Sequence, residues 1–116
     1  MKTTIQQLNL QLISSTVFNA FDGRRVVKDL LQNRDLWTGV VLDRLGSLIK
    51  LRDISSDTWN VDTLFILASN KDNKALEAIA RKWEADEVDW VEQKEAERLL
   101  GSWNGGKHNI LRLWWD

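Results

Sequence analysis

Residues 61–68 read VDTLFILA, and this stretch decides the fold class. Residues 64–67 form an unbroken apolar run with the length of one β-strand. A strand without polar alternation is typical of one that is covered on both faces, so we expect a central strand here.

A helix and a second strand are predicted directly after it. Capping residues at 69–72 precede a segment in which one helical face is shared by Leu76, Ile79, Ala80 and Trp83. Val88 and Trp90 then alternate with acidic residues, as in a short strand with one wet face. Residues 61–91 therefore predict a β-α-β unit, which forms a right-handed crossover if its two strands are parallel.

The C-terminal part extends this unit. Residues 92–100 predict a short helix, because acidic residues come early, Arg98 lies in the last turn and Gly101 suits a C-cap. Residues 110–115 predict a last strand, which we expect beside the 61–68 strand. The whole chain, 1–116, is thus predicted to be a single α+β domain, a mixed β-sheet with two or three helices packed mainly on one face.

The N-terminal part is harder to interpret. Leu8, Leu10 and Leu12 alternate with polar residues, which favours a strand, although Ile5, Leu8 and Leu12 also fit one face of a helix. Asp22 suits the N-cap of a helix that carries apolar residues at 26, 27, 30 and 31 and ends at Asn33.

Residues 35–54 fit two structures. Trp37, Val41, Leu45 and Leu48 suit a helix, whereas Gly39 and Gly46 would each weaken it by about 1 kcal/mol. In the rival hairpin, residues 37–42 and 48–54 are strands and residues 43–47 connect them. We favour a strand for residues 48–54.

Composition excludes several kinds of site. The 116 residues include no Cys and one His, so disulfides, thiolate ligands and His-rich zinc sites are removed from consideration. The net charge is −1, with +2 through residue 58 and −3 after it, a split too small to predict nucleic-acid binding. The N-terminus resembles no export signal and no stretch suits a membrane span, so we expect a soluble cytoplasmic protein without membrane contact.

Seven Trp are the most unusual feature of the composition. Trp is enriched at protein interfaces because it offers a large contact area with few rotatable bonds. Most of these residues should fill the core. Trp114 and Trp115 must point to opposite sides if they lie on a strand, so we expect one of them to face outward as an interface anchor.

Residues 101–108 form a Gly-rich loop that could hold an anion. The candidate ligand-binding residues are Trp103, Asn104, Lys107, His108 and Arg112. The loop lacks the residue order of a phosphate-binding loop and precedes a strand, which weakens this hypothesis. His108 would be the first choice for acid–base catalysis, but the sequence offers it no identifiable partner.

Two charged groupings have simpler interpretations. Seven carboxylates between Glu84 and Glu97 lack calcium-loop spacing, so we predict a solvated acidic face and no metal site. The helix from Arg24 to Arg34 carries basic residues that could contact phosphates, but Asp29 and Asp35 dilute them.

No run of residues carries the motif of a family. The leading hypothesis is a non-enzymatic protein-interaction or self-associating module that uses its aromatic C-terminal surface and needs no cofactor. The alternatives are a small-ligand-binding protein or enzyme that uses residues 103–112, and nucleic-acid binding through the helix from Arg24 to Arg34.

Overall fold

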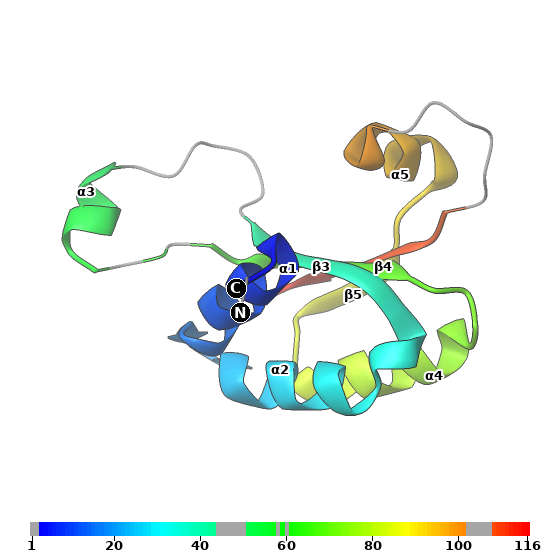
Figure 1. Cartoon of the computed structure of the whole chain (residues 1–116), viewed down its shortest axis with the longest axis horizontal. Coiled ribbons are helices and arrows are strands. Elements are labelled where there is room, and N and C mark those ends of the chain that lie inside the picture. Colours follow the sequence, from blue (N-terminus) through cyan, green and yellow to red (C-terminus); the bar gives the residue numbers. More distant parts are fainter. Residues whose placement is uncertain (1–2, 44–50, 58, 60, 102–107) are drawn as a thin grey trace.

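A computed structural model describes residues 3–43, 51–57, 59, 61–101 and 108–116. Its centre is a four-stranded sheet in the order β3-β4-β6-β5 (Figure 1). The strands are β3 (Trp37–Asp43), β4 (Thr63–Ala68), β5 (Glu87–Trp90) and β6 (Ile110–Trp114). Together with five α-helices in the described residues, this sheet confirms the predicted α+β class.

The β-α-β prediction is confirmed in outline and refined in its pairing. The helix α4 (Asn73–Ala80) connects β4 to β5, and the last strand lies beside β4 as expected. However, β6 lies between β4 and β5 and pairs antiparallel with both, and β3 pairs antiparallel with β4. Neighbouring strands are therefore antiparallel at all three pairings, although β4 and β5 run in the same direction. The prediction of a mixed sheet is wrong, because β6 lies between the two strands that were expected to be parallel neighbours.

One face of the sheet, here the inner face, is covered by helices. α2 (Gly23–Gln32) and α4 lie on this side, whereas α5 (Gln93–Leu100) lies on the opposite side (Figure 1). Strand pairing places two apolar rows on the inner face: Leu42, Leu64, Leu113 and Val88 in one, and Val40, Ile66, Leu111 and Trp90 in the other. These rows pack with Val26, Leu30, Leu76 and Ala80 of the helices in one core.

The N-terminal strand prediction is wrong, because residues 5–14 form the helix α1 (Ile5–Ser14). Thr4 and Gln7 form a reciprocal capping box, which favours a helix over the strand suggested by alternation. Gln6 then fixes the helix beside the sheet: its carboxamide donates to Val40 O at 2.8 Å and accepts from Val40 N at 2.9 Å.

A close contact joins α1 to α2. The N–H of Gly23 donates to Thr16 O at 3.1 Å. A Cβ atom on Gly23 would lie 1.7 Å from Ile13 O, so only glycine allows the start of α2 to approach the end of α1 this closely. The predicted N-cap Asp22 and C-cap Asn33 of α2 are confirmed.

The 35–54 segment combines one correct and one wrong prediction. Residues 37–43 form β3 as in the hairpin interpretation, but the described part of the predicted second strand is the helix α3 (Leu51–Ser55). In the structure β3 pairs with β4 along one edge, and on its other edge the backbone of Val40 is bonded by Gln6. Residues 44–50, with Gly46, lie outside the described residues.

The remaining elements are short. β1 (Val17–Phe18) and β2 (Phe21–Asp22) form a hairpin between α1 and α2. The 3-10 turns η1 (Arg34–Leu36) and η2 (Arg81–Trp83) follow α2 and α4. In the part of the chain that the structure describes, no helix is both long enough and apolar enough to cross a membrane.

Candidate functional site

Most of the tryptophans hold the fold together through their ring N–H groups. Five of them donate hydrogen bonds: Trp37 to Leu30 O at 2.8 Å, Trp83 to Asp29 at 2.8 Å, Trp90 to Glu77 at 2.6 Å, Trp114 to Asp62 at 3.2 Å and Trp115 to Trp83 O at 3.1 Å. Each bond joins two segments of the chain. Each bond also gives the ring N–H the acceptor that a buried Trp needs. Trp103 lies outside the described residues.

The two C-terminal tryptophans point to opposite sides, as the strand geometry predicts. Trp115 is only 1% exposed and packs edge-on against Phe21, with ring centroids 4.7 Å apart. Trp115 is therefore a core residue, and of the two candidate interface anchors it is the one that the structure contradicts. Trp114 is half-buried on the other side of the sheet and remains the candidate anchor.

The outer face of the sheet surrounds Trp114 with mixed side chains. One row across the strands consists of Val41, Phe65, Arg112 and Asp89. The Arg112 guanidinium lies 3.0 Å from an Asp89 carboxylate oxygen and 3.3 Å from one of Glu87. Because Arg112 already has two carboxylate partners, it is poorly placed to serve as the anion-binding residue of the predicted loop site.

The structure describes only part of that predicted loop site. Trp103, Asn104 and Lys107 lie outside the described residues. His108 is half-buried, and its Nε2 atom is buried without a hydrogen-bond partner. The neighbouring Asn109 side chain donates to Asn70 at 2.6 Å. No arrangement for acid–base catalysis is visible among the described residues around His108.

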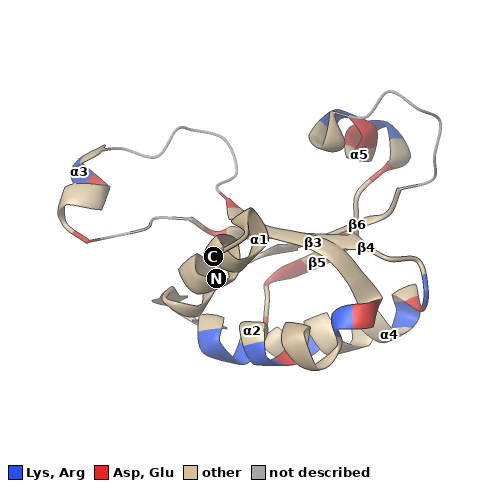
Figure 2. Ribbon diagram, in the orientation of Figure 1, with Lys and Arg blue, Asp and Glu red and all other residues tan. Residues whose placement is uncertain are grey.

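The basic helix is also partly committed to structure. Arg34 lies 3.9 Å from the centre of the Trp37 ring and donates to Trp37 O at 2.6 Å. Arg24, Arg25 and Lys28 remain exposed on α2, which Figure 2 shows as blue segments interrupted by an acidic one. Arg34 is thus bound to Trp37, whereas the other three cations are exposed on α2. The four side chains therefore do not form one continuous basic surface.

Large apolar side chains are exposed on α1, β1 and α3, and three of them, Leu12, Val17 and Ile54, line one pocket. We call the exposed apolar residues of these three elements the apolar corner: Ile5, Leu8, Leu12, Val17, Leu51 and Ile54. The exposed fraction is 76% for Ile5, 70% for Val17 and 86% for Leu51. The corner contains most of the large exposed hydrophobic residues in the described chain, the others being Leu31, Val41 and Leu99.

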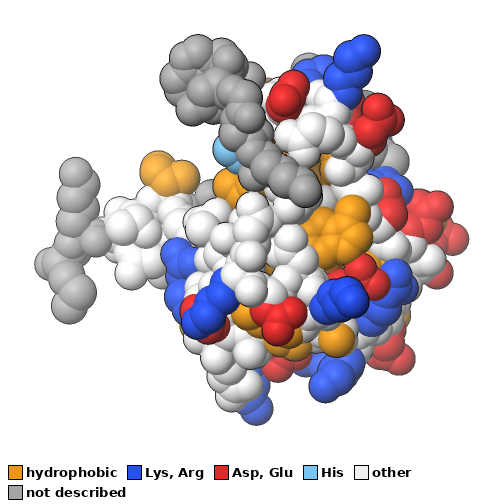
Figure 3. All heavy atoms as spheres, turned by 90° about the vertical axis from the view of Figure 1, so that its right-hand side faces the viewer, with side chains coloured by type: hydrophobic (Ala, Val, Ile, Leu, Met, Phe, Trp, Pro, Cys, Tyr) orange, Lys and Arg blue, Asp and Glu red, His pale blue; other side chains and the backbone are white. Residues whose placement is uncertain are grey.

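The end of the molecule around α4 and α5 also exposes hydrophobic side chains. Figure 3 shows them there as patches separated by side chains of both charges. The apolar corner has charged neighbours as well, because α3 also contains Arg52 and Asp53. In the sequence, the spacing of Ile5, Leu8 and Leu12 along one helical face was the available signal for this group. The capping box predicts the helix, but it does not predict that the apolar face turns inward.

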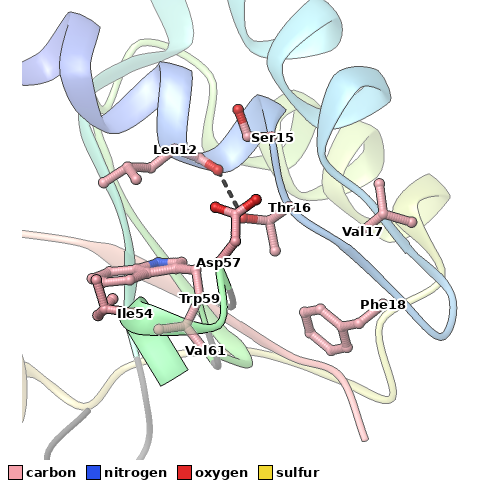
Figure 4. Close-up of a pocket in the computed structure, with 9 residues that line it drawn as sticks. All are labelled: Leu12, Ser15, Thr16, Val17, Phe18, Ile54, Asp57, Trp59 and Val61. Carbon is pink, nitrogen blue, oxygen red and sulfur yellow. Dashed lines mark hydrogen bonds between the residues drawn. The ribbon is translucent and has the colours of Figure 1, made fainter. Parts of the chain in front are cut away.

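A pocket of about 640 Å³ opens inside this corner. Figure 4 shows its lining side chains, which come from the end of α1, the β1–β2 hairpin, α3 and the segment before β4. Its apolar lining consists of Leu12, Val17, Phe18, Ile54, Trp59 and Val61. A volume of this size is typical of small-ligand pockets, for which roughly 300–1,000 Å³ is usual.

The polar groups of the pocket are mostly hydrogen-bond acceptors. The hydroxyl of Ser15 donates to Gln11 O at 2.9 Å and that of Thr16 donates to Leu12 O at 2.7 Å, which leaves their oxygens as acceptors. Asp57 adds an exposed carboxylate at a positive φ of 58°. Trp59 is the exception, because its buried ring N–H has no hydrogen-bond partner.

No metal site accompanies the pocket. In the described ranges, no three His, Cys, Asp or Glu side chains come together in a way that could hold a metal ion.

Comparisons of the chain with protein-family models, with curated proteins and with solved structures found no match.

Proposed function

We propose that this chain is a non-enzymatic interaction module that self-associates through the apolar corner. The observation that carries the proposal is the concentration of exposed hydrophobic residues on α1, β1 and α3. Scattered surface hydrophobics are normal, but a group that meets at one pocket, as Leu12, Val17 and Ile54 do, usually marks a place where another molecule binds.

A second copy of the chain is the partner we propose. The net charge of −1 produces little repulsion between copies, and the six corner residues are uncharged. A twofold axis through the corner would place the same apolar patch on both sides of the interface, as in most homodimers.

Light scattering over a concentration series tests self-association directly. We expect the mass to rise from 13.5 kDa towards twice that value as the concentration increases. Leu8→Lys places a charge in the corner at a residue that is 46% exposed and should give a monomer. Leu99→Lys is the matched control, because Leu99 is 43% exposed but lies on α5.

The outer face around Trp114 is a second candidate interface. Its support is the half-exposed aromatic pair of Phe65 and Trp114 beside Arg112 and its two carboxylates. If this face carries the interface, Val41→Lys should dissociate the dimer and Leu8→Lys should not. A mass of one chain at all concentrations would contradict self-association through either surface.

A further inference from the structure

The pocket in the apolar corner has a chemical preference that follows from the polar groups around it. The last turn of α1 and the two residues after it form one wall, through Leu12, Ser15 and Thr16. The C-terminus of a helix carries a partial negative charge, although in α1 the carbonyls of residues 11–13 already accept hydrogen bonds from Ser15 and Thr16. No basic side chain lies in this last turn to compensate that charge.

Asp57 adds a full negative charge to the same pocket. It is the one charged residue among the described residues that line the pocket, and it forms no ion pair with a described Lys or Arg. The hydroxyl oxygens of Ser15 and Thr16 also present lone pairs, because their hydrogens point to carbonyl groups of α1. The pocket therefore combines a carboxylate, a helix C-terminus and two acceptor oxygens, with no compensating cation among the described residues that line it.

Trp59 supplies the one unsatisfied donor among the described residues that line the pocket. Its Nε1 atom is buried without a partner, and a buried donor left without an acceptor typically costs about 1–3 kcal/mol. The other described tryptophans all have an acceptor for this hydrogen, so the exception falls on the tryptophan that lines the pocket. The rings of Trp59 and Phe18 also offer faces that attract cations.

From these groups we infer that the pocket binds a small organic cation. The ligand has an ammonium group for Asp57 and the end of α1, an apolar body for Phe18, Ile54 and Val61, and an oxygen that accepts the Trp59 N–H. A single copy of the chain supplies all groups of this site. Leu12, Val17 and Ile54 belong to both the pocket and the apolar corner, so ligand binding has to be measured on the monomer.

L-phenylalaninol is a suitable probe, because it combines an ammonium group, a hydroxyl oxygen and a phenyl ring. Binding is followed by NMR through the indole N–H signals, and the Trp59 signal is identified by its absence in Trp59→Phe. We expect a saturable shift of the Trp59 signal with L-phenylalaninol. Neutral N-acetyl-L-phenylalaninol and anionic 3-phenylpropanoate should bind at least about tenfold more weakly, as expected when an ionic hydrogen bond is lost.

A pair of variants tests the carboxylate. Asp57→Asn removes the charge from the pocket and should weaken L-phenylalaninol binding at least about tenfold. Asp53→Asn removes the same charge from α3, four residues before Asp57 and outside the described pocket lining, and should leave binding unchanged. Phenethylamine lacks the oxygen and should bind more weakly, with a smaller shift of the Trp59 signal.

Several outcomes would overturn the inference. These are no saturable shift with L-phenylalaninol, equal binding of the neutral analogue, or unchanged binding to Asp57→Asn in a variant whose spectrum remains that of the folded protein. Measurements on dilute protein, and on Leu8→Lys if it is monomeric, separate ligand binding from self-association. A monomeric wild type that binds L-phenylalaninol would contradict only the proposed function.

Discussion

The inner and outer faces of the sheet use the same strands in opposite ways. On the inner face, Leu64 and Leu113 are fully buried under the helix layer. On the outer face, the neighbouring row contains the ion-paired Arg112 and Val41, which is 40% exposed. Stability should therefore reside in the inner rows and the helices on them, while the outer rows are free to take polar or interacting residues.

The largest difference should come from truncating one residue on each face. Leu64→Ala removes a fully buried side chain from the core and should lower the free energy of unfolding by about 2–5 kcal/mol. Val41→Ala removes a partly exposed side chain and should cost less than about 1 kcal/mol. Urea denaturation measures both values, and similar losses would contradict the division between the faces.

Two glycines extend the comparison from the helix layer to the strands. Gly23→Ala must separate α1 from α2, because the new Cβ would lie 1.7 Å from a backbone oxygen, and should destabilise by about 3 kcal/mol. Gly39→Ala on β3 is the control, since its nearest neighbours would lie at 3.7 and 3.9 Å. Thermal unfolding of the two variants should show a large shift only for Gly23→Ala.

A smaller effect is expected where α1 meets the sheet. Gln6→Met keeps the size of the side chain but leaves the N–H and carbonyl of Val40 without their partner, at an expected cost of about 1–2 kcal/mol. Gln11→Met changes an exposed residue of the same helix and should be almost neutral. If denaturant unfolding gives equal values for both, the two hydrogen bonds contribute little to stability.

The smallest effect concerns the link between α4 and β5. Hydrogen bonds from Arg81 and Trp90 hold the pKa of Glu77 below its ordinary value of 4.5. Because the folded pKa is lowered, this contribution to stability is present above pH 4.5 and is lost as the pH falls through the lowered value.

A substitution tests this sign. Glu77→Gln should be less stable than the wild type near neutrality, and the difference should shrink in acid. Denaturant unfolding, measured once near neutral pH and once in acid, gives the two free energies of unfolding. Glu92→Gln, at an exposed residue, is the control. A difference that stays constant with pH would show that packing of the side chain matters more than its charge.

The elements that the sequence predicted best are those in which one signal dominates. The apolar run at 64–67 and the caps at Asp22, Asp72 and Gly101 specify β4 and the ends of three helices. The N-terminal helix was missed because alternating leucines resemble a strand, while the capping box of Thr4 and Gln7 carried the decisive information. The antiparallel insertion of β6 depends on long-range pairing that local patterns do not encode.

The candidate site was less predictable than the fold. The opposite orientations of Trp114 and Trp115 followed from strand geometry, but the sequence could not tell which ring is buried. The corner depends on apolar residues of α1 and α3 that point outward, against the usual tendency of such residues to be buried. Trp59 became notable only when the hydrogen-bond partners of the other tryptophans were known.

The two hydrogen bonds of Gln6 also bear on how readily the sheet could add a strand from another molecule. An unprotected edge strand offers its backbone to a strand of another molecule, and repeated addition leads to aggregates. At Val40 both backbone groups of the β3 edge are occupied by the side chain, and the β5 edge is four residues long with two carboxylates. Growth of the sheet by strand addition is thus hindered at both edges.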